Sequence, residues 1–251
     1  MNKEKWIWSI LTLLILILTA FTSSSDQDRR IKSLVFEISD PANHYLVNSD
    51  DLYRYLYSYM DTVDGYKASV IELYTIETIL EGNSHVGNAE AFIDRQSKVR
   101  VQVDLKEPIL RVLSNDSRGY YVTEDADIVE WSPNYTPRLI VASGNVPKYE
   151  HQDSLSVEDQ NSLNALSYLV SEINKMSYLQ SIVDEIIYNG ENNIELVSKI
   201  GEARVLIGDT TDLVEKLERF SLFHTEAYPI VGWDKYKVID VRFKDKVYCR
   251  K

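Results

Sequence analysis

Histidine, cysteine and carboxylate side chains are the groups in this sequence that could bind a metal or catalyse a reaction. The four histidines lie in separate stretches with no HxxxH or HExxH spacing: His44, His85, His151 and His224. The single cysteine, Cys249, excludes a disulfide framework and a cysteine-based zinc site, and it is expected to be an inert residue at the end of a strand. The sequence therefore predicts no metal site and no cofactor.

Two pairs of carboxylates have spacings that could serve acid–base catalysis, Asp125 with Asp127 and Asp184 with Glu185. Such pairs are more often found on solvated faces or turns. Residues 82–87 are similar to the first half of a phosphate-binding loop, but Asn88-Ala89 replaces the required Lys-Ser/Thr pair. The sequence therefore predicts a plain loop there, no catalytic residue, no small-molecule substrate and no enzymatic activity.

The charge balance of the chain argues against a nucleic-acid partner. The 251 residues include 27 Lys and Arg against 39 Asp and Glu, which gives a formal net charge of −12. An acidic chain without a basic run repels phosphate groups. Hydrophobic residues make up 44% and charged residues 26%, a balance typical of folded domains.

An uncharged apolar stretch, residues 6–25, predicts a single membrane-spanning helix. Twenty helical residues span about 30 Å, the thickness of a bilayer core. Lys3 and Lys5 precede it, so the positive-inside rule places residues 1–5 in the cytoplasm. A cleaved signal peptide is the alternative, and either interpretation exports residues 26–251.

The exported part predicts an α+β fold with a stalk and two domains. Residues 26–30 are the polar stalk, residues 31–108 read β-α-α-β-β, and residues 109–251 are richer in strands with flanking helices. The first helix is predicted to be capped at Ser49, with Tyr55 and Tyr59 facing the core. Tyr53 and Tyr57 point elsewhere on this helix, where they could contact a partner.

The second exported domain is predicted from clear periodicities. A helix spans residues 157–175, and a hairpin turns at residues 189–193. A later helix is expected to be capped by Thr210 or Thr211. The last strand is expected to run from Tyr236 to Tyr248, because its alternation shows no acceptable turn.

This order of elements resembles the FtsQ/DivIB family of bacterial cell-division proteins, particularly its Bacteroidota-like members. The first exported domain resembles the POTRA domain of that family. The resemblance covers nearly the whole chain and depends on the order and spacing of weak motifs. These are Ile76-Glu77 through Asp94, Val99 through Val112, Gly119-Tyr-Tyr-Val122 with Asp127, Gly201 through Leu217, and Tyr236 through Val247.

The resemblance implies a non-enzymatic single-pass scaffold of the divisome in the inner (cytoplasmic) membrane at the division septum, with its bulk in the periplasm. It implies partners that are FtsB-like and FtsL-like, in a complex that controls septal peptidoglycan synthesis. The FtsB-like partner would add a strand to the edge of the last strands. The matching positions are Val241, Arg242, Phe243, Lys244 and Asp245.

In that docking strand, Phe243 would be an apolar anchor and Arg242 would contact an acidic residue of the partner. Burial of Phe243 in the domain core, on the face it shares with Ile239 and Val241, is the competing interpretation. Two other functions stay open at this point. One is an exported envelope hydrolase that uses a carboxylate pair, and the other is an outer-membrane assembly module with a POTRA unit.

Overall fold

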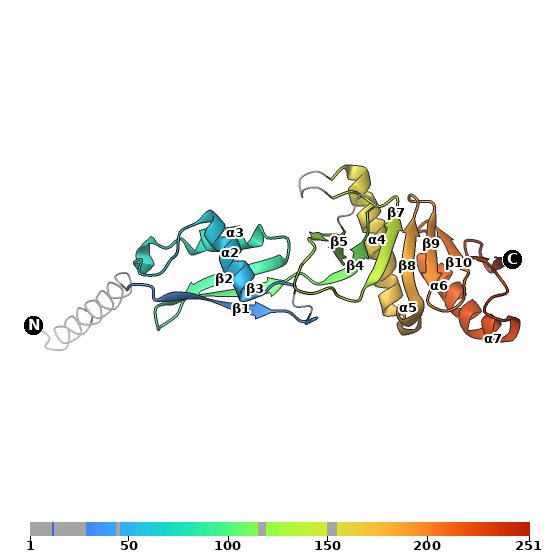
Figure 1. Cartoon of the computed structure of the whole chain (residues 1–251), viewed down its shortest axis with the longest axis horizontal. Helices are drawn as coiled ribbons and strands as arrows, with labels where there is room; N and C mark the ends of the chain where they lie inside the picture. The colour runs from blue at the N-terminus through green and yellow to red at the C-terminus, as the bar shows by residue number, and fades with distance from the viewer. Residues whose placement is uncertain (1–11, 13–28, 44–45, 115–118, 150–154) are drawn as a thin grey trace, which may run out of the picture. The chain divides into compact units, whose positions relative to one another are not determined.

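The computed structural model describes residues 12, 29–43, 46–114, 119–149 and 155–251 (Figure 1). In these ranges we find no helix with both the length and the apolar character needed to cross a membrane. The predicted anchor, residues 6–25, lies outside the described residues except for Thr12. The chain divides into two compact units, which we describe separately. The first ends at Leu105, and the second runs from Lys106 to Lys251 and also includes residues 42–46.

The first unit is a three-stranded sheet with its two α-helices on one face (Figure 1). The central strand, β3, is parallel to β1 and antiparallel to β2. The order β-α-α-β-β agrees with the sequence pattern. In chain order the elements are β1 (Ser33–Ser39), α2 (Ser49–Tyr59), the 3₁₀ turn η1 (Ala68–Val70), α3 (Leu73–Glu81), β2 (Val86–Ile93) and β3 (Lys98–Leu105).

The alternation of apolar and polar side chains along the strands decides which face of this sheet the helices cover. Along most of β1 and β3 a buried side chain alternates with a more exposed one, because successive residues of a strand point to opposite faces. The two helices contribute apolar residues at helical spacing to the same core. The buried residues are Leu34 and Phe36 of β1, Val99, Val101 and Val103 of β3, Leu52 and Leu56 of α2, and Ile76 and Leu80 of α3.

The start and the tyrosines of α2 differ from the sequence-based expectation. Asn48, not Ser49, is the N-cap, and it forms a capping box with Asp51. Tyr59 is 66% exposed, so its predicted place in the core is wrong: α2 ends at this residue and no element covers it there. Tyr53 packs inward instead, because its hydroxyl donates to the Leu34 carbonyl at 2.6 Å.

The second unit is built on a nine-stranded sheet in the order β12-β11-β10-β9-β8-β7-β4-β5-β6. Its first half contains β4 (Pro108–Val112), β5 (Tyr120–Thr123), β6 (Ile128–Val129), β7 (Ile140–Gly144), α4 (Val157–Lys175) and α5 (Ser177–Ile182). Its second half contains β8 (Val183–Tyr188), β9 (Ile194–Ser198), β10 (Arg204–Gly208), α6 (Leu213–Leu222), the π-helical turn η3 (Phe223–Ala227), α7 (Tyr228–Val231), β11 (Val238–Asp240) and β12 (Tyr248–Arg250).

Helices α4, α5 and α6 contribute to one core together with the sheet of this unit (Figure 1). The buried apolar residues of α4 are the four inward positions expected from the helical period, Leu163, Leu166, Val170 and Ile173, together with Leu169. The α4 bounds match the prediction, and Ser156 and Asp159 form a capping box there. The cap predicted for α6 is wrong. Neither Thr210 nor Thr211 caps it, because Asp212 holds the N-cap position in a left-handed conformation without a side-chain cap.

Candidate partner-binding edge

The outermost strand β12 gives the sheet of the second unit an edge on the C-terminal side. It pairs antiparallel with β11 in the register Val238↔Arg250, Ile239↔Cys249 and Asp240↔Tyr248. In the described part of the chain no strand pairs with its other side. An unpaired strand edge presents N–H and C=O groups that an added strand can satisfy.

The hydrogen bonds of β11 show which groups of β12 face outward. The Arg204 N–H of β10 donates to the Lys237 carbonyl (2.9 Å), and the Val241 N–H donates to the Leu206 carbonyl of β10 (3.2 Å). Backbone groups alternate along a strand, so residue 239 also faces β10, whereas residues 238 and 240 face β12. Their partners, residues 250 and 248, therefore point inward. The N–H and C=O of Cys249, which lies between them, point to the free edge.

The five residues predicted to dock a partner do not form a strand. The prediction of one continuous strand from Tyr236 to Tyr248 is wrong, because β11 ends at Asp240 and β12 begins at Tyr248. Residues 241–245 belong to the connection between them, and we call residues 241–247 the terminal loop. Asp245 adopts a left-handed φ of 58°, and the Lys246 N–H donates to the Phe243 carbonyl at 3.4 Å. Asp tolerates this conformation better than most residues, which lets the chain turn here.

The start of the terminal loop is held by interactions within the unit. Val241 is fully buried, and its carbonyl accepts hydrogen bonds from Nε and one terminal nitrogen of Arg219, at 3.2 and 3.1 Å. Arg242 forms a bidentate pair with the buried Asp240, at 2.8 and 2.7 Å. The same guanidinium lowers the pKa of the Asp240 carboxyl. These two residues therefore position the loop, and the Arg242 charge is already matched by Asp240.

The tip of the terminal loop is open to a partner. Phe243 is 50% exposed, which disagrees with its burial in the core. Its ring meets Tyr248 edge to face, with centroids 5.0 Å apart, and Tyr248 is 49% exposed. Lys244 and Asp245 are also exposed. Phe243 and Tyr248 together form an apolar patch beside the free edge of β12, the kind of surface that anchors an interface.

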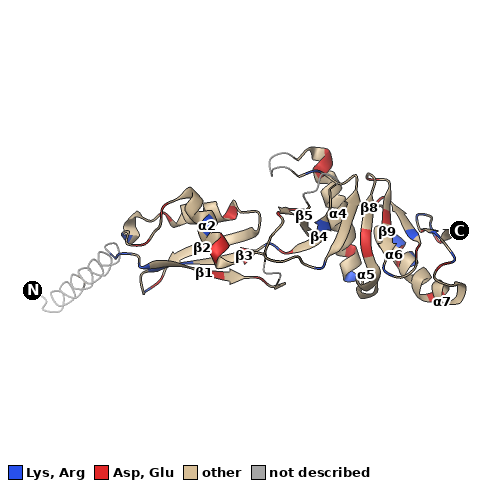
Figure 2. Ribbon diagram, in the orientation of Figure 1, with Lys and Arg blue, Asp and Glu red and all other residues tan. Residues whose placement is uncertain are grey.

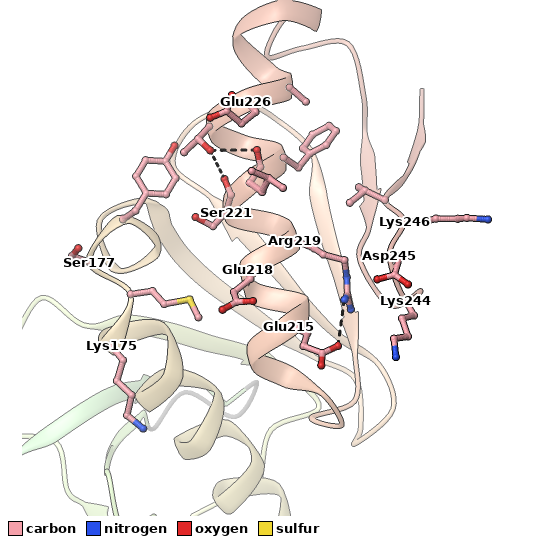
Figure 3. A pocket seen from close by; sticks show the side chains of 17 residues that line it. Lys175, Ser177, Glu215, Glu218, Arg219, Ser221, Glu226, Lys244, Asp245 and Lys246 are labelled. Atoms are coloured by element: carbon pink, nitrogen blue, oxygen red, sulfur yellow. Dashed lines mark hydrogen bonds and ion pairs between the residues drawn. The ribbon is translucent and has the colours of Figure 1, made fainter.

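A groove of about 1220 Å³ lies between α6, the start of α5 and the terminal loop. In Figure 3, Glu215 and Arg219 of α6 lie on the side of the groove near Lys244 and Asp245. Arg219 forms an ion pair with Glu215 at 3.8 Å. Apolar side chains, among them Met176, Leu222 and Phe223, also line this groove. It is therefore a surface lined by both charged and apolar side chains, next to the exposed edge.

A buried lysine secures the turn that leads into α6. Lys216 is 6% exposed, and its Nζ donates to the Asp209 carbonyl (2.9 Å) and to Oδ1 of the same residue (2.6 Å). This hydrogen bond holds the pKa of the Asp209 carboxyl below its usual range. Asp209 also accepts a hydrogen bond from the Thr211 N–H at 3.1 Å, which holds the turn before the N-cap residue Asp212. The ion pair thus fixes the end of α6 that carries Glu215.

His224 is the most enclosed ionisable group near the groove. Its ring is 0% exposed and packs against Phe220, Tyr228 and Trp233. Nδ1 lies 2.5 Å from the Tyr178 hydroxyl, and Nε2 lies 3.5 Å from the Ser198 hydroxyl. Burial lowers the pKa of this imidazole. Because the site is closed and aromatic, it stabilises the neutral ring and joins α5, β9 and η3.

We expect the second unit to lose stability in mild acid because of His224. The folded pKa is lower than the ordinary value of 6.5, so the unfolded chain binds the proton more readily. The stability is therefore fully present above pH 6.5 and falls as the pH drops below it. Urea unfolding of the full chain, followed by tryptophan fluorescence between pH 8 and pH 5, measures this. His224→Phe is expected to weaken the dependence, and an equally steep dependence in that variant would contradict it.

The other candidates for chemistry do not form a shared site among the described residues. Asp127 pairs with Lys106 at 2.8 Å, and Glu185 accepts a hydrogen bond from Ser143 at 2.6 Å. No group of three potential metal ligands occurs in the described part of the chain. His44 and His151 lie outside it. His85 contacts its neighbours Asn83 and Ser84 in the loop of residues 82–87. The pKa of the Cys249 thiol is raised by burial, which disfavours a reactive thiolate.

Comparison with known proteins gives the family. The family described as "FtsQ/DivIB, C-terminal related" matches residues 107–250, more than half of the chain. The chain belongs to this FtsQ/DivIB family. The matched residues run from the start of the second unit through β12, so they include the exposed edge and the terminal loop. No curated protein matches the chain.

Membership in the FtsQ/DivIB family indicates a role in cell division, within a family of non-enzymatic scaffold proteins. The family acts through other proteins of the division machinery, so its functional sites are expected to be binding surfaces and not catalytic pockets. Residues 241–245, which the sequence predicts for such a surface, lie in the terminal loop beside the edge strand β12. The sequence prediction missed Tyr248 and the outward backbone of Cys249, and the one local signal for them is the Lys244-Asp245 pair that permits the turn.

Proposed function

We propose that this protein is a single-pass membrane scaffold of the bacterial divisome that holds FtsB-like and FtsL-like proteins and helps to control septal peptidoglycan synthesis. The family match over residues 107–250, which ends at an exposed edge strand, carries the proposal. The β-α-α-β-β first unit is POTRA-like in the order of its elements. The apolar residues 6–25 would anchor the chain in the inner membrane, with both units in the periplasm.

The proposed docking mode is strand addition at β12. A partner strand would bond to the outward N–H and C=O of Cys249 and continue the sheet. Because β12 is only three residues long, these bonds are few. A net contribution of about 0.5–1.5 kcal/mol for each bond is too little for a stable complex by itself. Side chains near the edge must therefore supply most of the affinity.

Phe243 and Tyr248 would supply the apolar contacts. Both are half exposed, and they already pack on each other, so little side-chain entropy is lost when a partner covers them. Arg242 is matched by Asp240, so the cation that would meet an acidic partner residue is the exposed Lys244. Of the five residues named from the sequence, Phe243, Lys244 and Asp245 thus remain contact residues, while Val241 and Arg242 position them.

The test uses the full chain with a small tag in growing cells. The expected result is concentration at mid-cell together with retention of FtsB-like and FtsL-like proteins after mild detergent extraction. A variant with Phe243→Ala and Tyr248→Ala should retain much less of the partner while still reaching the membrane. Even distribution around the cell with neither partner retained would contradict the proposal.

A further inference from the structure

The cations of the first unit are gathered at one end of it. Three backbone segments meet there. The Ile31 N–H donates to the Tyr66 carbonyl, and the Ala68 N–H to the Arg29 carbonyl, each at 2.8 Å. On the other side, the Lys32 N–H donates to the Ser97 carbonyl at 2.9 Å. We call this surface, formed by residues 29–32, 63–70 and 95–98, the basic end.

The basic end has a charge opposite to that of the rest of the unit. Residues 26–105 contain eight Lys and Arg, and six of them belong to this end: Arg29, Arg30, Lys32, Lys67, Arg95 and Lys98. Asp64 lies within it, and Asp26, Asp28, Asp61, Glu72, Asp94 and Arg100 lie within three residues of it in sequence, which gives seven cations against six carboxylates, a net charge of +1. The remainder of residues 26–105 has one cation and eight carboxylates, a net charge of −7. Figure 2 shows blue segments where the described chain enters the unit.

The local structure keeps these cations accessible. Arg29, Arg30, Lys32, Lys67 and Arg95 are all exposed. The nearby Asp94 is occupied, because its carboxylate accepts from Nε of Arg100 at 2.8 Å and from the Lys98 N–H at 2.9 Å. This lowers the pKa of the Asp94 carboxyl and keeps its charge matched.

Two apolar side chains project from the same end. Tyr66 is 50% exposed and Val70 is 62% exposed, and both lie in the segment that bonds to residues 29–31. Tyrosine is enriched where proteins meet the interface of a membrane, because it has an apolar ring and a polar tip. The basic end thus combines cations with side chains suited to the headgroup layer.

The length of chain before the unit fixes what this end can reach. Only four peptide units separate Ser25, the end of the proposed anchor, from Arg29. Fully extended, they span at most about 14 Å. The headgroup layer on one side of a bilayer is about 5–8 Å thick. A chain anchored through residues 6–25 would therefore hold the basic end within about one Debye length, roughly 8 Å, of the lipid headgroups.

We infer that the basic end docks on the anionic phospholipid headgroups of the membrane that anchors the chain, which orients the first unit. The inference depends on the anchor of the proposed function but not on the partner edge. Each Lys or Arg close to an anionic surface strengthens binding about fivefold, so loss of three weakens docking about 100-fold.

The test uses the full chain in lipid nanodiscs. A fluorophore at Val70→Cys, with Cys249→Ala to remove the native thiol, reports quenching by headgroup spin labels. The same fluorophore at Ser39→Cys is the matched control, because residue 39 lies at the opposite end of β1, about 20 Å along the strand. We expect strong quenching at position 70 only, in discs with phosphatidylglycerol and not with phosphatidylcholine alone. About 1 M salt should abolish it, because the Debye length falls to about 3 Å.

The decisive variant carries Lys32→Glu, Lys67→Glu and Arg95→Glu. It should lose the quenching, while Arg138→Glu, Lys199→Glu and Lys235→Glu together, exposed positions of the second unit with the same change in charge, should retain it. A milder variant with glutamine at positions 32, 67 and 95 serves if the glutamates impair folding, with a smaller loss expected.

Equal quenching in both lipids, quenching that appears only when a partner protein is added, or an unaffected glutamate variant would overturn the inference. A chain that does not enter the discs would contradict the anchor and the inference together. A chain that enters the discs and retains its partners without quenching would contradict the inference alone.

Discussion

Replacement of Cys249 by proline is expected to weaken the binding of an FtsB-like partner strongly while leaving the fold intact. The N–H of residue 249 faces the free edge of β12, so proline removes a donor that the sheet itself does not use. The proline ring would also stand in the path of an added strand. A carbonyl of the partner left without its donor costs about 1–3 kcal/mol, so the affinity should fall roughly 10- to 100-fold. Titration of the full chain with the partner measures it.

Two controls separate the backbone from the side chain. Cys249→Ala removes the thiol and keeps the N–H, so binding should be almost unchanged. Lys244→Pro places the same ring in the terminal loop, where none of the described hydrogen bonds uses the Lys244 N–H, so it should lose only the contribution of the exposed Lys244 cation, less than Cys249→Pro loses. Equal affinity of Cys249→Pro and Cys249→Ala would show that the partner does not pair with β12.

Gly144→Ala is expected to be the most destabilising of the single-methyl additions in the second unit. Gly144 ends β7 with φ of 96°, and an added Cβ would lie 2.5 Å from the Tyr188 carbonyl oxygen. That oxygen also accepts the Asn145 N–H at 2.6 Å, so it cannot withdraw without disturbing the pairing of β7 with β8. Backbone strain of about 1–3 kcal/mol adds to the clash. We therefore expect the free energy of unfolding of the second unit to fall by about 3 kcal/mol or more.

Gly190→Ala is the matched control for this substitution. Gly190 has φ of 109°, but an added Cβ meets nothing within 4 Å, so only the strain of about 1–3 kcal/mol applies. The chain has two units, so a single two-state fit is not valid, and native-state hydrogen exchange of β7 and β8 amides should be measured. Equal losses for the two variants would show that the contact with Tyr188 does not matter.

Local signals predicted much of the fold, and non-local pairing explains what they missed. Helix α4 was predictable because Ser156 caps it and its apolar residues recur with the helical period. The hairpin between β8 and β9 followed from the Asn- and Gly-rich turn at residues 189–193. The place of β7 between β4 and β8 could not be read from a five-residue stretch in a proline-rich region, because its pairing depends on residues far away in the sequence.

At the candidate edge, too, the local sequence pattern predicted one part of the structure and non-local contacts decided another. The alternation Ile239, Val241 and Phe243 favours one strand, and the pattern itself contains no break. A tertiary contact accompanies the break, because Arg219 of α6 donates to the Val241 carbonyl, and a local ion pair between Asp240 and Arg242 adds to it. Propensity could have indicated only the left-handed Asp245. The sequence therefore predicted contact residues that lie beside the edge strand β12, but it did not predict the turn that separates β11 from β12.

The sheet of the second unit ends in strands of three residues at β12 and two residues at β6. Long, flat borders allow copies of a protein to polymerise into fibres, whereas short ones give a neighbouring copy little to grip. The edges of this sheet therefore give a second copy of the chain little backbone to pair with, which disfavours self-association through them. Because β12 is so short, any strand added to it would dissociate quickly. Fast dissociation is useful in machinery that is assembled and dismantled in every generation.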